Sequence, residues 1–215
     1  MIHPHTKVLN IDEQHGSGIF ATQLIPKGTL ITVPSEVDQV LSMEQVSAMP
    51  WSEREFLAEY AYLTNDGQYV LHHDEARYMN HSCDSNTLTV VDIDICIAVR
   101  DILVNEEITE DYGLYYADDD TFECLCGSLK CRKKIRQDDI TQYGDEWDQS
   151  IASVFQLIPK VKQPLWQVIS SSVREQIEAI LAGKMSIPSC KVLKCSPDYL
   201  KKAGELLWPS INEPF

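Results

Sequence analysis

Basic residues are scarce in this chain. It holds 18 Lys and Arg against 33 Asp and Glu, which gives a formal net charge of -15 at pH 7. A protein that binds nucleic acid directly needs a basic stripe, so we expect no direct contact with nucleic acid. The acidic balance instead favours a basic partner, such as a Lys-rich protein or peptide segment, although acidity also serves solubility alone.

Long apolar runs are missing as well. No run approaches the roughly 18 residues of a membrane-spanning helix, so we expect no membrane contact. The first residues, MIHPHTKVLN, lack the apolar core of a secretion signal. We therefore expect a cytoplasmic protein, or a nuclear one if the source is eukaryotic, and leave a secreted effector open. A length of 215 residues fits one domain, alone or with a small appendage.

The cysteines do not suggest a disulfide framework, because they number seven and no secretion signal accompanies them. Cys124, Cys126 and Cys131 have the spacing C-x-C-x4-C, which is typical of metal thiolates. A closed structural zinc site takes four ligands, so a distant fourth is needed. Cys83 is the candidate, since it lies in the most polar stretch of the chain. Three buried or redox-active thiols are the alternative.

That polar stretch is R-Y-M-N-H-S-C-D-S-N, at residues 77–86. The amide of Asn80 can both donate and accept, which suits a ligand that carries an amino and a carboxylate group. Asn80-His81-Ser82 also matches a glycosylation acceptor, but that use requires a secreted chain. Elsewhere, Gly16-Ser17-Gly18 is expected to form a turn. Its glycines would let the backbone approach a ligand closely; the alternative is an ordinary turn without a binding role. Tyr112, in T-E-D-Y-G, would be a packing residue if it stood alone.

Short β-branched and aromatic runs separated by Gly and Pro predict a mainly β fold. The expected strands lie at residues 7–9, 19–21, 30–33, 88–91, 93–99 and 108–109. Ser42 is expected to cap one helix that runs to about Leu63. Asn65-Asp66-Gly67 signals a hairpin between 62–63 and 69–71.

The chain becomes helical near Asp138. Apolar residues recur at helical spacing from Trp147 to Ile158, a second helical stretch runs from Pro164 to Leu181, and a third begins at Ser196-Pro197. The third is expected to bury Tyr199, Ala203, Leu206 and Leu207. This tail carries no recognisable motif. Packing is its expected role, and a homodimer contact is left open.

Four motifs follow one another in a telling order: G-S-G-I-F-A with I-P-K-G, R-Y-M-N-H-S-C-D-S-N, E-I-T-E-D-Y-G, and F-E-C-L-C-G-S-L-K-C-R. Together they resemble the SET-domain protein lysine methyltransferases with a post-SET zinc motif, in particular small stand-alone bacterial-type members. The resemblance covers roughly residues 5–136. It implies a mainly β SET fold of small sheets with a C-terminal pseudoknot. The domains would be a SET domain at 1–116 with a helical insert at about 38–76, a post-SET motif at 117–136, and a helical extension at 137–215.

The resemblance also implies an activity, which is transfer of a methyl group from S-adenosylmethionine to a lysine of a histone or another basic protein. Tyr112 would be the catalytic tyrosine. One structural zinc ion would be held by Cys83, Cys124, Cys126 and Cys131. The cofactor would contact Gly16, Ser17, Gly18, Arg77, Asn80, His81, Phe122 and Leu125. A catalytically idle SET-like module that binds a peptide or partner is the alternative.

The chain departs from the family pattern at four places. Ser85 replaces a usual Pro, and Lys133 replaces the Gly that often follows C-R. Val33-Pro34-Ser35-Glu36 stands where an aromatic Tyr-x-Gly-Glu run is common. Glu110 occupies a position where many members carry the Phe or Tyr that tunes the degree of methylation. The last two leave open whether mono-, di- or trimethylation is expected.

Overall fold

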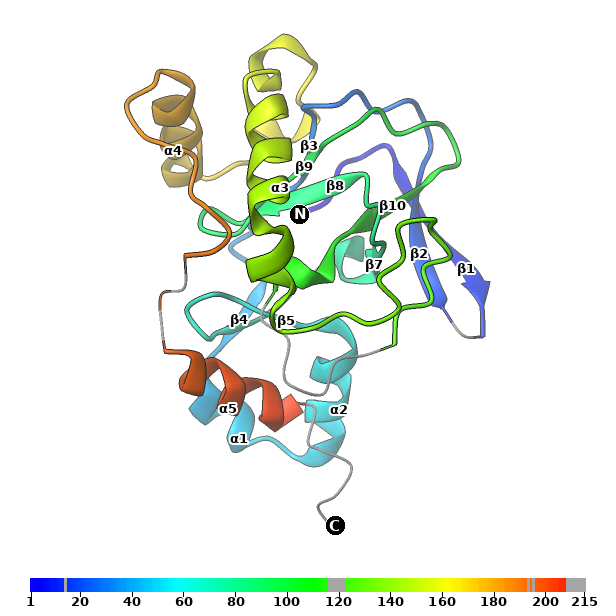
Figure 1. The fold of residues 1–215 in the computed structure, drawn as a ribbon, viewed down its shortest axis with the longest axis vertical. Coiled ribbons are helices and arrows are strands. Elements are labelled where there is room, and N and C mark those ends of the chain that lie inside the picture. Colours follow the sequence, from blue (N-terminus) through cyan, green and yellow to red (C-terminus); the bar gives the residue numbers. More distant parts are fainter. Residues whose placement is uncertain (14, 116–122, 193, 195, 208–215) are drawn as a thin grey trace.

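The computed structural model describes residues 1–13, 15–115, 123–192, 194 and 196–207 (Figure 1). Its strands form small separate sheets, in the orders β1-β2-β10-β7, β3-β9-β8 and β4-β6-β5. The predicted mainly β fold of small sheets, with helices in the C-terminal part, is confirmed for these residues. No described helix has the length and apolar character needed to cross a membrane.

The first sheet joins distant parts of the chain. It consists of β1 (Thr6–Asp12), β2 (Gly16–Ala21), β10 (Glu107–Glu110) and β7 (Asn80–His81). Strands β1 and β10 run antiparallel to β2, whereas β7 runs parallel to β10 with Asn80 opposite Thr109. A stretch that was polar in sequence is thereby placed beside the T-E-D-Y-G run.

The Gly-Ser-Gly motif is not itself a turn, contrary to the sequence prediction. Gly16 to Gly18 begin β2, and the reversal precedes them, with an irregular register between Asn10 and Asp12. Gly16 has a φ of 63°, a left-handed conformation that glycine adopts without steric cost. The backbone of the motif is therefore held in register by strand pairing.

The second sheet forms the centre of the main core. All residues of β3 (Leu30–Thr32), β9 (Ile95–Ala98) and β8 (Thr87–Val90) are buried. Helix α3 (Asp139–Phe155) packs on this sheet, and α4 (Ser171–Leu181) contributes to the same core. The short helices η3 (Ile158–Lys160) and η4 (Pro164–Gln167) lie between them in the chain. The shared core contains Leu88, Ile97, Ile151, Phe155 and Ile177. Each such side chain contributes about 1.5–3 kcal/mol by leaving water.

The third sheet belongs to the expected insert. It contains β4 (Gln39–Leu41), β6 (Tyr69–Leu71) and β5 (Tyr62–Leu63), and the predicted hairpin between β5 and β6 is confirmed. Ser42 caps a helix as predicted. The prediction of one continuous helix was wrong, because the chain forms two helices, α1 (Met43–Ser47) and α2 (Trp51–Tyr60). Pro50 lies between them, where it has no N–H to continue the first helix.

The last described helix, α5 (Pro197–Leu207), returns to this insert. Figure 1 shows it beside α1 and α2, at the lower end of the molecule. Leu200, Ala203 and Leu207 share a core with Val46 and Leu57, and the Tyr69 hydroxyl donates to the Ala203 carbonyl at 2.5 Å. The buried face is centred on Leu200, one residue from the predicted Tyr199.

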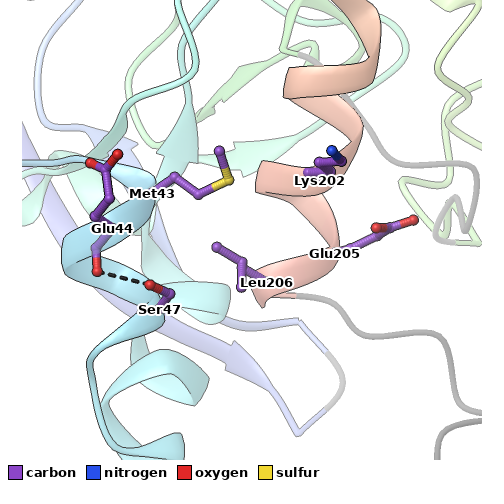
Figure 2. A pocket seen from close by; sticks show the side chains of 6 residues that line it. All are labelled: Met43, Glu44, Ser47, Lys202, Glu205 and Leu206. Carbon is purple, nitrogen blue, oxygen red and sulfur yellow. Dashed lines mark hydrogen bonds between the residues drawn. The ribbon is translucent and has the colours of Figure 1, made fainter.

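A hollow of about 460 Å³ opens between α1 and α5 (Figure 2). Its lining comes from both helices and mixes apolar and charged side chains: Met43, Glu44, Ser47, Lys202, Glu205 and Leu206. The Ser47 hydroxyl donates to the Glu44 carbonyl at 2.9 Å within α1. Because each helix supplies half of the lining, the hollow exists only while α5 is packed on the insert.

Candidate active site and cysteine cluster

Two single-turn helices lead into the site. η1 (Glu75–Tyr78) is capped by Asp74 and precedes β7, while η2 (Tyr112–Leu114) is capped by Asp111 and follows β10. The parallel pairing of β7 and β10 brings the two together. The backbone N–H of Tyr112 donates to Nδ1 of His81 at 3.1 Å, and the Tyr112 hydroxyl donates to the Met79 carbonyl at 2.7 Å. Tyr112 is thus held at both ends.

Burial keeps the Tyr112 hydroxyl protonated. Desolvation raises the pKa of Tyr112 well above its ordinary value, and the carboxyl groups of Glu110 and Glu107 raise it further. At neutral pH the group is therefore a neutral hydroxyl, which can orient a neighbouring group but is no base.

The structure brings Asn80 to the Gly-Ser-Gly motif. Its amide nitrogen donates to the Ser17 carbonyl at 3.1 Å and to Oε1 of Glu107 at 2.9 Å. A Cβ on Gly18 would lie 2.5 Å from that Glu107 oxygen and 3.0 Å from the Asn80 nitrogen, so a larger residue would push the amide away. Glycine at position 18 thus leaves room for the ends of these side chains.

The remaining predicted cofactor residues have different surroundings. The Arg77 guanidinium donates to the His73 carbonyl at 3.2 Å and lies over the Tyr78 ring, so its contacts stay close to η1. Leu125 is 54% exposed. The pKa of His15 is raised by its bonds to Asp12 and to the Leu125 backbone, which places Leu125 beside the start of β2. Phe122 lies outside the described residues.

The four predicted cysteines gather in one place. The sulfur of Cys124 lies 3.6 Å from the sulfur of Cys83 and 3.6 Å from that of Cys131. The donor atoms of His81, Cys83, Cys124 and Cys126 all lie within 4.8 Å of one another. Two sulfurs bound tetrahedrally to zinc at about 2.3 Å are about 3.8 Å apart, so this spacing fits such an ion.

His81 is an alternative to Cys131 as a metal ligand, but the hydrogen bonds of His81 argue against that role. Burial lowers the pKa of His81 to about 4, so the ring is neutral. Since Nδ1 accepts the Tyr112 N–H, the ring proton is assigned to Nε2. That nitrogen lies 3.2 Å from the Cys83 sulfur, to which it donates. His81 thus links the cysteine cluster to Tyr112.

Backbone amides surround the sulfurs. The N–H of Arg132 donates to Cys83 at 3.3 Å, and the N–H of Lys133 donates to Cys131 at 3.4 Å. Burial opposes ionisation of Cys126, but donation from backbone N–H groups and the neighbouring thiols lowers its pKa to about 7. Such donors stabilise thiolates, the form that binds metal. Lys133 has a φ of 65°, a conformation that explains why glycine suits this position.

Arg132 is a site residue that sequence reasoning missed. Its guanidinium donates to both oxygens of Asp111 at 2.8 and 2.5 Å, and its Nε lies 3.2 Å from Oδ2 of Asp139 as an ion pair without hydrogen-bond geometry. It also lies over the rings of Tyr143 and Trp147. The cysteine segment, the residue before Tyr112 and helix α3 are therefore joined by one side chain. The available signal was an Arg directly after the last cysteine of the C-x-C-x4-C motif.

Glu110 is buried at the end of β10, with 3% of its surface exposed. Its Oε2 accepts the Tyr115 hydroxyl at 2.8 Å. The Thr89 side chain also lies close enough to the carboxyl to lower the pKa of Glu110, as the Tyr115 hydroxyl does. Burial raises the pKa of Glu110 to about 7, so the carboxyl is poised between its two protonation states near neutral pH.

Comparison with known proteins agrees with this geometry. Residues 16–113 match the model of the SET domain. The chain contains a SET domain. The match includes the Gly-Ser-Gly motif, the polar stretch at 77–86 and Tyr112, and it ends at Gly113. The cysteine segment and helices α3 to α5 lie after it.

The SET domain has curated relatives of modest identity. The chain is 30% identical over 130 residues to the histone-lysine N-methyltransferase trithorax of Drosophila virilis, which covers 56% of this chain and 3% of that protein. It is 27% identical over 164 residues to the probable inactive histone-lysine N-methyltransferase SUVR1 of Arabidopsis thaliana, which covers 63% and 22%. The chain thus spans a small part of the length of these relatives.

Solved structures with SET domains are similar in part. The structure of KRYPTONITE in complex with mCHG DNA and SAH matches with a TM-score of 0.45 and 21% identity, over 60% of this chain and 28% of that one.

Proposed function

We propose that this chain is an S-adenosylmethionine-dependent methyltransferase that modifies a lysine side chain of a protein substrate. The observation that carries the proposal is the convergence of three separate motifs of the SET domain. Asn80 bonds the Gly-Ser-Gly strand, and Tyr112 bonds both His81 and the Met79 carbonyl. The names of the curated relatives support the same reaction class.

The cofactor would be held by the backbone of Gly16, Ser17 and Gly18 together with Asn80 and His81. The fit rests on Gly18, where the absence of a side chain leaves room between the strand and the Asn80 amide. Leu125 and the proposed contacts of Arg77 and Phe122 would complete that binding surface. When bound, S-adenosylmethionine supplies a methyl group on a positively charged sulfur, so no further activation of the methyl group is needed.

The chain itself would contribute the positioning of the reacting groups and the exclusion of water. A lysine amine must be neutral to react, yet its free pKa is about 10.4. Burial beside a cation lowers that pKa, because it disfavours the ammonium form. The neutral Tyr112 hydroxyl, fixed by its bond to the Met79 carbonyl, would accept from the amine or the methyl group and hold them in line.

The cysteine cluster would hold one structural zinc ion through Cys83, Cys124, Cys126 and Cys131. Four thiolates around such an ion would fix the segment after residue 123 against β7. Arg132 would then carry this order to Asp111, directly before Tyr112. Zinc would thus shape the site without contact with the substrate.

A basic protein is the proposed substrate. The formal charge of -15 attracts positively charged segments and repels nucleic acid. Histones fit this description, in keeping with the names of the relatives, and other Lys-rich proteins fit it equally.

The test is transfer of labelled methyl from S-adenosylmethionine into core histones and a mixture of basic proteins. Tyr112→Phe removes only the hydroxyl and should lower the transfer rate at least about 100-fold, as expected for a lost orienting group. Tyr199→Phe removes a hydroxyl from α5 and should leave the rate unchanged. Equal transfer by Tyr112→Phe and wild type would overturn the role of Tyr112.

An idle binding module is the second candidate. Two observations favour it: Glu110 replaces an aromatic residue common in the family, and one relative is named as probably inactive. Titration of the zinc-loaded protein with S-adenosylmethionine separates the candidates. Binding with methyl transfer supports the enzyme, whereas the absence of both supports the binding module.

A further inference from the structure

Helix α3 lies outside the part of the chain that matches the SET domain, yet it contacts η2, the short helix that begins with Tyr112. Asp139, Tyr143 and Trp147 recur at every fourth position of α3, so they share one face of the helix. Asp139 and Trp147 are buried, with 1% and 7% of their surface exposed. This face of the first turns of α3 is therefore packed against protein and not turned to solvent.

Trp147 contacts the residue that follows Tyr112. A Cβ on Gly113 would lie 2.9 Å from the outer ring carbon Cη2 of Trp147 and 3.1 Å from Cβ of Asp139. Both distances are shorter than an ordinary van der Waals contact, so glycine at position 113 lets η2 approach α3 closely. The turn that carries Tyr112 is thus held by hydrogen bonds to β7 and by close packing against α3.

Trp147 also acts on the residue that precedes Tyr112. The Arg132 guanidinium lies over its ring, 5.7 Å from the centroid, in the arrangement of a cation–π contact. That guanidinium donates to both carboxylate oxygens of Asp111. Asp111 in turn caps η2, since its Oδ1 accepts the Gly113 N–H at 3.0 Å. One ring therefore supports the turn on both sides of Tyr112.

We propose that Trp147 is a positioning residue for methyl transfer, which holds Tyr112 in place through Gly113 and through Arg132. This inference rests on the proposed methyltransferase function. The Tyr112 hydroxyl orients the reacting groups only while its backbone is fixed, and a displacement of about 1 Å can cost about a hundredfold in rate. Trp147 would touch neither cofactor nor substrate, so its replacement should lower kcat and leave KM unchanged.

Steady-state kinetics of methyl transfer into core histones tests this role. Trp147→Phe keeps a ring for Arg132 but removes the outer ring carbons beside Gly113, so kcat should fall about tenfold at unchanged KM. Trp147→Leu removes both contacts and should lower kcat about tenfold further. Phe155→Leu is the matched control, because it removes ring atoms from the same helix and core about two turns further along. It should keep the wild-type kcat, with all rates compared at a temperature at which every variant is folded.

A substitution on the other side of the contact tests the inference even if the Trp147 variants fail to fold. Gly113→Ala places a methyl group against the Trp147 ring and should also lower kcat. In the double variant Gly113→Ala, Trp147→Phe the smaller ring makes room for that methyl group. Its kcat should exceed the product of the two single effects by at least about threefold. Single effects that simply multiply would overturn the inference, as would an equal loss of kcat in Phe155→Leu and Trp147→Phe.

A spectroscopic measurement separates this inference from the proposed function. Nδ1 of His81 accepts the Tyr112 N–H at 3.1 Å, and its ¹⁵N chemical shift depends on how strongly it accepts. In the full zinc-loaded chain, this shift should move toward that of an unbonded imidazole nitrogen in Trp147→Phe and Gly113→Ala, and stay unchanged in Phe155→Leu. That result supports the positioning role even if no histone is methylated, an outcome that would count against the proposed function alone. An unchanged shift in both Trp147→Phe and Gly113→Ala overturns the positioning role.

Discussion

Two regions of the molecule are held together by different physical means. The cysteine flank, which comprises Cys83 and residues 123–134, is held by sulfur contacts, backbone donors and the Arg132 ion pairs. The helical flank, which comprises β4 to β6, α1, α2 and α5, is held by apolar packing around Leu57, Tyr69 and Leu200. Leu129 is fully exposed, so the cysteine flank has little apolar area of its own.

The two flanks therefore depend on different interactions for their order. If the cysteine cluster holds zinc as proposed, order in the cysteine flank depends on thiolates, the bound ion and one buried arginine. Order in the helical flank requires that α5 be present, because its side chains complete the apolar cluster. The first should respond to chelators and oxidants, and the second to changes of buried volume.

Loss of Arg132 should have the largest effect. Arg132→Met leaves Asp111 and Asp139 buried without their cation, so the free energy of unfolding should fall by about 3–5 kcal/mol. Urea denaturation measures this. Bound zinc should remain near one equivalent, because the backbone N–H to Cys83 is retained. Arg136→Met, at an exposed position, is the control, and a loss under about 1 kcal/mol for Arg132→Met would contradict the proposed linkage.

Truncation of Leu200 should break the helical flank alone. The residue is fully buried, so Leu200→Ala should cost about 3 kcal/mol. Amide hydrogen exchange should accelerate in α1, α2 and α5 and stay unchanged around Cys83 and Cys124. Glu205→Ala, on the exposed side of the same helix, should leave exchange unaltered. Faster exchange in both flanks would show that they are one cooperative unit.

Glu110 is buried at the end of β10, outside both flanks, and should give the protein a pH-dependent stability. Because burial raises its pKa to about 7, the stabilisation from its protonated form is complete below the unfolded value of about 4.3 and is lost as pH rises through 7. Glu110→Gln lacks this titration. Its stability relative to wild type should therefore increase by about 2 kcal/mol between pH 5 and pH 8. Curves of stability against pH that stay parallel for the two proteins would contradict the raised pKa of Glu110.

Replacement of Lys133, in the cysteine flank, should have the smallest effect on stability. Its φ of 65° strains a residue with a Cβ, so Lys133→Gly should stabilise the protein by about 1 kcal/mol. Asn105 has a φ of 63°, but asparagine tolerates this region, so Asn105→Gly should have less effect. Thermal denaturation with and without zinc measures both. An equal change in stability for the two substitutions would contradict the argument from backbone strain at Lys133.

Local signals in the sequence predicted local structure. Asn65-Asp66-Gly67 fixed the β5–β6 hairpin, and Ser42 capped α1, since both depend on neighbouring residues alone. The order of the motifs also indicated which residues meet, because it matched a family whose chain path is known. The structure accordingly brings Asn80, Tyr112 and the four cysteines together; their roles as cofactor, catalytic and zinc residues stay predictions.

Other features depend on long-range geometry that no local pattern encodes. The pairing of Arg132 with Asp111 spans 21 residues and exists only because the cysteine segment folds back on η2. The spacing of apolar residues predicted α5, but an amphipathic face does not name the surface that it covers. The burial of the Glu110 carboxyl was likewise invisible, because it depends on which side chains reach the end of β10.

The packing of α5 on the insert has a consequence for synthesis of the chain. Tyr69 meets Ala203 across 134 residues, so the apolar faces of α1 and α2 are made long before their cover. Until α5 leaves the ribosome, these faces are open to other nascent chains and to chaperones. A chain that stalls on the ribosome after residue 190 would therefore expose the apolar faces of the insert. The exposure of that insert, probed by limited proteolysis of stalled chains, would report when translation of α5 is complete.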